Sequence, residues 1–157
     1  MRKAFFIIAL GIIISGCKST SITNTKLERH SQVDIKGNWT LTSVDYPSSE
    51  YIKIISFQIA DSKCFEGSTW KFISNNNKGE FTLNNSSCST FSSAITWFIN
   101  DEGQFVLKIL DAGLKAKKVR NGFVLTIANQ SQTRFQLIDK VDIGGKMTSV
   151  IYQFQKN

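Results

Sequence analysis

The side chains with the most distinctive chemistry in this sequence are three thiols, at Cys17, Cys64 and Cys88. A cysteine can be acylated, joined to a second cysteine, bound to a metal ion or used as a nucleophile, depending on its surroundings. Histidine, a frequent partner of cysteine in metal sites and in catalysis, occurs once, as His30. The sequence around each thiol therefore decides which chemistry it supports.

Cys17 ends an N-terminal segment that is typical of exported proteins. Arg2 and Lys3 are the only charges ahead of an apolar run over residues 4–14, and two small residues separate that run from the cysteine. A run of about 11 residues is too short for a membrane span, which needs about 20. The segment is therefore predicted to be a secretory signal peptide over residues 1–16.

The four residues Ile14-Ser15-Gly16-Cys17 also resemble the lipobox of bacterial lipoproteins. The resemblance implies that Cys17 is acylated on its thiol, becomes the first residue after cleavage, and is acylated again on its new amino group. Several acyl chains hold a protein on a membrane where one would be marginal. Lys18 stands where an acidic residue retains some lipoproteins at the inner membrane, so we expect an outer-membrane location in the bacterial cell envelope. The alternative is an ordinary signal peptide with a chance cysteine.

Cys64 and Cys88 form an even pair in an exported chain, a pattern that predicts a disulfide. Closing a loop of about 25 residues would stabilise the fold by roughly 3 kcal/mol in the chain-entropy model. Metal binding is disfavoured, because the thiol spacing is not that of zinc sites and His30 lies in the polar leader. We expect no metal and no cofactor.

The sequence also argues against an enzyme. Outside the leader it contains no histidine to act as a base near pH 7, and no glycine-rich phosphate loop. Several carboxylates fall at turns or strand ends, where solvated acids are ordinary: Glu66, Asp101, Glu102, Asp111 and Asp139.

The formal charge of +7 includes Arg2 and Lys3, and the charge that remains without them does not by itself favour nucleic-acid binding. We expect a monomer that binds no nucleic acid.

The elements that carry these residues are predicted from composition and alternation. Residues 17–36 are mostly polar and predict a flexible spacer. Beyond them, runs of alternating apolar and polar residues separated by turn residues predict eight strands. These cover residues 38–44, 68–74, 79–83, 94–100, 104–110, 121–128, 134–139 and 148–154. Residues 51–61 are compatible with a short helix or an extra strand. The pattern predicts an all-β, antiparallel domain over residues 37–157, closed as an up-and-down barrel or folded as a sandwich, and an eight-stranded barrel leaves no edge.

Gly37-Asn38-Trp39, at the start of the first predicted strand, matches the Gly-X-Trp signature of lipocalins. With "CFEGSTWKF", the second cysteine at Cys88, "ITWFI" and "GGKMTSVIYQFQK", the chain resembles the lipocalin-like domain of many small bacterial lipoproteins over residues 35–156. The resemblance implies that Trp39 closes one end of a lipocalin-like barrel. An arginine often covers this tryptophan in the family. The last strand has Lys156 at that place instead, and Arg134 could substitute for the arginine.

The resemblance further implies an interior that accepts one small hydrophobic ligand. The aromatic residues proposed to line it are Trp70, Phe72, Trp97, Phe105 and Phe123. The same side chains could instead fill the core. The alternative function is a structural or protein-interaction platform with a filled barrel. Its candidate docking patch is the basic cluster Lys115, Lys117, Lys118 and Arg120.

Overall fold

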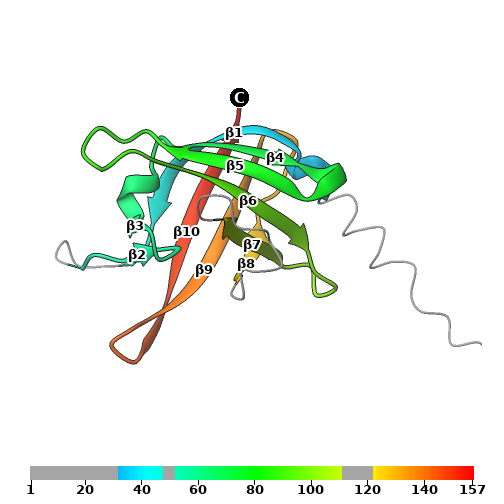
Figure 1. Ribbon diagram of the computed structural model, residues 1–157. Helices are drawn as coiled ribbons and strands as arrows, with labels where there is room; N and C mark the ends of the chain where they lie inside the picture. Colours follow the sequence, from blue (N-terminus) through cyan, green and yellow to red (C-terminus); the bar gives the residue numbers. More distant parts are fainter. Residues whose placement is uncertain (1–31, 48–51, 111–121) are drawn as a thin grey trace, which may run out of the picture.

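The fold is a closed antiparallel barrel of eight strands, seen in a computed structural model that describes residues 32–47, 52–110 and 122–157. The strands follow one another around the barrel in the order β1, β10, β9, β8, β7, β6, β5, β4 (Figure 1). Their bounds are β1 Gly37–Asp45, β4 Thr69–Ile73, β5 Lys78–Leu83, β6 Phe91–Ile99, β7 Phe105–Leu110, β8 Phe123–Ala128, β9 Arg134–Ile143 and β10 Lys146–Lys156. The predicted eight-stranded up-and-down barrel is confirmed.

Between β1 and β4 the chain forms a small hairpin outside the barrel wall. Strands β2 (Ile55–Ser56) and β3 (Ala60–Asp61) pair with each other in a separate two-stranded sheet. A 3₁₀ helix, η1 (Ser62–Phe65), follows at once, and a second one, η2 (Ser74–Asn76), joins β4 to β5. Of the two alternatives for residues 51–61, the described part therefore takes the strand form.

Alternation along the strands places one set of side chains inside the barrel. On β10, Val150, Tyr152 and Phe154 are buried, and the residues between them are more exposed. This period of two is the geometry of a pleated strand with one face on the core. In β1 the pairing with β10 shifts between Leu41 and Ser43, so that Val44 returns to the buried face.

The folded part of the chain begins before Gly37. Residues 32–35 form one helical turn, and the side chain of Ile35 is fully buried in the core cluster. The predicted spacer, residues 17–36, therefore shares its last residues with the packed domain. Among the described residues, none lies in a helix long and apolar enough to cross a membrane.

Candidate functional site

One end of the barrel, here called the sealed end, is where the chain enters β1. The side chain of Trp39 is fully buried there, and its Nε1 donates a hydrogen bond to the Ile35 carbonyl at 2.7 Å. Its ring lies edge-to-face on Phe135, with 4.7 Å between ring centroids. The ammonium nitrogen of Lys156 lies 5.2 Å from the Trp39 ring centroid, a cation–π distance. Lys156, which stands in place of the family's arginine, therefore covers the tryptophan itself.

Gly37 is required at this end by the backbone. Its φ is +133°, a conformation that side chains disfavour, and a Cβ there would lie 3.2 Å from Cε of Lys156. The Gly-X-Trp pattern thus has a local physical reason, because the glycine leaves room for the lysine that covers the tryptophan.

Four of the five residues proposed to line a ligand lie inside the barrel, near the sealed end and its middle. Phe72 and Phe105 contact each other and the ring of Trp97, with centroid distances of 5.3 Å for Phe72–Trp97 and 5.5 Å for Trp97–Phe105. Trp70 stacks on Phe81 at 4.5 Å. These four side chains are at most 3% exposed and pack against one another. Their contact with a ligand stays a prediction.

The fifth residue, Phe123, lies at the opposite end, here called the covered end. The turn of the β2–β3 hairpin reaches over this end and inserts Phe57, which is only 5% exposed. The Phe57 ring lies 5.2 Å from that of Phe123, 5.3 Å from Phe65 and 5.1 Å from Tyr152. The covered end is therefore closed by a side chain from outside the barrel wall.

Three buried hydroxyl groups lie beside the Phe57 turn. Ser56 Oγ is 2.6 Å from both Tyr152 Oη and Ser62 Oγ, and Ser62 Oγ donates to the Ile54 carbonyl at 2.8 Å. Burial raises the pKa of the Tyr152 phenol far above its ordinary range, and the hydrogen bond with Ser56 only partly opposes this. Tyr152 is therefore a neutral hydroxyl, able to donate or accept a hydrogen bond.

A carboxyl group also faces the interior in this half of the barrel. Asp139 lies on β9 two residues from Leu137 and Val141, which both pack in the core, and it pairs across the sheet with the buried Val150. Burial raises the pKa of the Asp139 carboxyl, and a hydrogen bond from the Lys140 backbone partly opposes the shift. Sequence reasoning placed this residue at a strand end, whereas it lies within β9.

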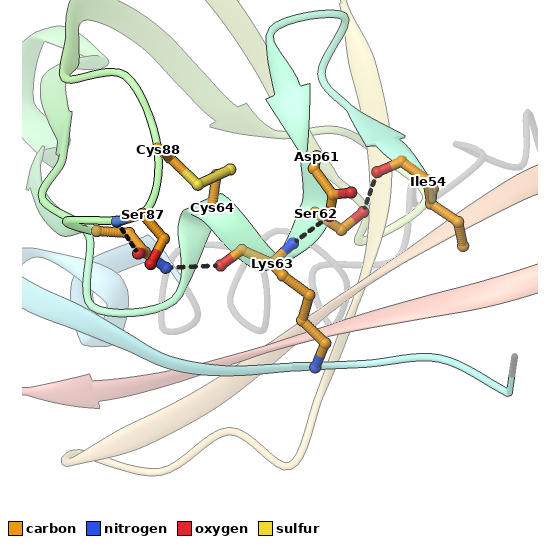
Figure 2. The surroundings of a disulfide bond; sticks show 8 residues. Ile54, Asp61, Ser62, Lys63, Cys64, Ser87 and Cys88 are labelled. Carbon is orange, nitrogen blue, oxygen red and sulfur yellow. Dashed lines mark hydrogen bonds between the residues drawn. A yellow bond between two sulfur atoms is a disulfide. The ribbon is translucent and has the colours of Figure 1, made fainter. Parts of the chain in front are cut away.

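The predicted disulfide is confirmed and links η1 to the loop between β5 and β6. Cys64 and Cys88 are joined with an S–S distance of 2.03 Å and a Cα–Cα distance of 5.8 Å (Figure 2). The Asp61 side chain accepts from the Lys63 amide at 2.9 Å at the start of η1, and Asn85 donates to the Lys63 carbonyl at 3.2 Å. Strand β3, which follows the turn, runs directly into η1 and is therefore linked through η1 to the loop between β5 and β6.

The covered end was not predicted from the sequence as a site. Phe57 and Ser56 lie in the segment whose secondary structure was ambiguous, and the turn contains no glycine or asparagine to mark it. Tyr152 lies in the last predicted strand, residues 148–154, and the sequence assigned it no role of its own. Within the described residues no cluster of acids, cysteines and histidines is arranged to hold a metal ion. Cys17 and the basic cluster at residues 115–120 lie outside the described residues.

The sequence matches one family model, described as a lipocalin-like domain, over residues 35–137. The chain belongs to the lipocalin-like domain family. A comparison with curated proteins finds no match. Among solved structures, a bovine odorant-binding protein in complex with a selenium-containing odorant is similar, with 14% identity and a TM-score of 0.46 over 80% of this chain and 72% of that one. Lobster apocrustacyanin A1 is also similar, with 13% identity and a TM-score of 0.49 over 87% and 70% of the two chains.

Proposed function

We propose that this lipocalin-like protein binds or carries a small hydrophobic ligand in the bacterial cell envelope, tethered through acylated Cys17. The ligand enters at the covered end. One observation carries this proposal: the sealed end is closed by the start of the barrel itself, whereas at the covered end the described part of the chain supplies a hairpin turn through Phe57 as the closure. A closure supplied from outside the wall can move without opening any barrel strand.

The lining of this end suits an apolar molecule. The rings of Phe65, Phe123 and Tyr152 surround Phe57, and the wall beneath is made of apolar strand residues. Ligand pockets are predominantly apolar with a few placed polar groups, and here Tyr152 and Ser62 provide hydroxyls. The carried ligand is therefore expected to be mainly hydrophobic with limited polar character.

A titration of the full chain with a fluorescent fatty acid tests this proposal. Phe123→Arg places a charge on the inward rim, and Val124→Arg places the same charge one residue further, where the side chain is 51% exposed. We expect the parent and the Val124 variant to bind the probe alike and the Phe123 variant to lose it. Native mass spectrometry after exposure to a lipid extract identifies the class of bound species.

The second candidate function is a filled platform that docks a partner. It is favoured by the dense aromatic packing of Phe72, Trp97 and Phe105, which leaves these rings essentially without exposure. A chain that binds no apolar probe and carries no species from the lipid extract would support the platform.

The tether has its own test, because lipobox processing depends on the thiol. Cys17→Ser is expected to leave the chain without acyl label and to release it from the membrane fraction. Labelling with a fatty-acid analogue followed by fractionation measures both. A labelled Cys17→Ser chain would contradict the assignment.

A further inference from the structure

The turn that covers the barrel has an unfavourable backbone. Phe57 and Gln58 have φ values of +53° and +58°, and the Ile59 amide donates to the Ser56 carbonyl at 3.0 Å. Positive φ at both central residues is characteristic of a type I′ turn, in which glycine, asparagine and aspartate dominate. A bulky residue with positive φ is an outlier in folded proteins. The turn is therefore strained, and burial of the Phe57 ring offsets the strain.

The surroundings of the Phe57 ring form a site of their own. Tyr152 stacks on it with an interplanar angle of 30°, and Phe65 and Phe123 meet it edge-to-face. Trp70 lies 6.4 Å away at an angle of 67°. Three of these four rings belong to the barrel strands β4, β8 and β10, and the fourth lies on η1 next to the disulfide. All four rings are thus carried by elements other than the turn itself.

Withdrawal of the turn also removes a hydroxyl group. Ser56 is adjacent to Phe57, and its Oγ lies 2.6 Å from the Tyr152 hydroxyl. Ser62 retains the Ile54 carbonyl as a partner when Ser56 leaves, if Ile54 stays in place. Tyr152, which is only 1% exposed, would lose the hydrogen bond that the structure gives it. A buried hydroxyl without a partner is unfavourable, so an occupant that brings its own hydroxyl is favoured.

We propose that Phe57 and Ser56 are a built-in occupant of a binding site, and that the ligand which displaces them is a small aromatic molecule carrying a hydroxyl group. Its ring takes the place of the Phe57 ring, and its hydroxyl takes the place of Ser56 at Tyr152. The inference rests on the proposed function and names the ligand class of the same barrel. The closed turn competes with the ligand for the same space. Strain in the turn destabilises the closed state and therefore raises the apparent affinity of the protein for the ligand.

Two probes separate the ring from the hydroxyl. Toluene reproduces the side chain of Phe57, and p-cresol adds one hydroxyl to it. Binding to the full chain is followed through the NMR signal of the Trp70 indole N–H, assigned with Trp70→Phe. We expect p-cresol to bind about tenfold more tightly than toluene, as one buried hydrogen bond allows. Tyr152→Phe is expected to abolish this preference.

Two substitutions are expected to shift the competition between the closed turn and the probe in opposite directions. Phe57→Ala removes the internal occupant and is expected to tighten binding of both probes by about tenfold or more. Gln58→Gly relieves one strained position, stabilises the closed turn and is expected to weaken binding by about fivefold. Asn129→Gly is the control, because Asn129 also has a positive φ, +49°, but follows β8 at the sealed end. It is expected to leave both affinities unchanged.

The outcomes separate this inference from the proposed function. Equal affinities of the parent and Gln58→Gly, or equal binding of the two probes, would overturn the inference. If Phe57→Ala fails to fold, Phe57→Leu replaces it, with a smaller increase expected and no increase contradicting the site. Should the fluorescent fatty acid bind while p-cresol shifts Trp70 in no variant, the inference falls and the proposed function stands. Should p-cresol bind Phe57→Ala while the parent takes no fatty acid, the site stands and the carrier function falls.

Discussion

The two ends of this barrel are both closed, but by different kinds of structure. At the sealed end, Trp39 belongs to the first barrel strand, hydrogen-bonds to Ile35 and packs beneath Lys156. At the covered end, Phe57 comes from a hairpin whose two strands have two residues each, and the backbone of its turn is strained. Free energies of local opening vary widely across a protein, and short segments with few strand contacts open most easily. The difference is the basis of our proposal that one end stabilises the fold and the other admits a ligand.

The largest expected effect comes from truncating the aromatic residues nearest the sealed end. Trp39→Ala and Trp97→Ala are each expected to lower the free energy of unfolding by about 3–5 kcal/mol, since both side chains are fully buried. Phe57→Ala is expected to cost clearly less, because the hairpin can lift away from the barrel without opening a barrel strand. Urea unfolding of the three variants measures the comparison. A loss at Phe57 equal to that at Trp39 would make the two ends equivalent.

The disulfide is expected to have the next largest effect. Replacing both Cys64 and Cys88 by alanine should lower the free energy of unfolding by roughly 3 kcal/mol, because the closed loop restricts the unfolded chain. Thermal unfolding with and without a reducing agent measures it. The agent should lower the melting temperature of the parent and leave that of the double variant unchanged. A parent insensitive to complete reduction would show that the bridge contributes no stability.

The smallest expected effect on the free energy of unfolding comes from the carboxyl group of Asp139, which faces the barrel interior. Because burial raises the pKa of Asp139, the folded state binds its proton more tightly than the unfolded state. Stability is then highest, for this group, below the unfolded pKa and falls as the pH rises through the folded pKa. Asp139→Asn is therefore expected to be slightly more stable than the parent at neutral pH, with the advantage vanishing in acid. Urea unfolding at several pH values checks this, and an advantage that grows in acid would contradict it.

The barrel was largely predictable, because most of its strands alternate apolar and polar residues and bury one face. Trp70 and Phe72 on β4, and Val150, Tyr152 and Phe154 on β10, show the period of two directly in the sequence. The disulfide followed from the parity of the remaining cysteines in an exported chain. These features depend on local pattern and on chemistry that the sequence displays.

The covered end was not predictable in the same way. A type I′ turn is normally marked by glycine or asparagine, and this one contains Phe57 and Gln58. Its conformation is imposed by burial against residues as distant in sequence as Tyr152. Likewise the choice of Lys156 over Arg134 as the cover of Trp39 depends on how the last strand pairs with the first. Contacts of this range leave no local signal.

Hydrogen exchange of the full chain tests the central claim most directly, because it compares the two ends in one sample. At the covered end, the Ile59 amide donates a hydrogen bond to the Ser56 carbonyl, and the Ser62 amide donates to the Ile54 carbonyl. At the sealed end, the Lys156 amide donates to the Thr133 carbonyl. We predict faster exchange of the two hairpin amides, and a change in that rate alone when a fluorescent fatty acid is added. Equal exchange at both ends, unaffected by the probe, would contradict the account.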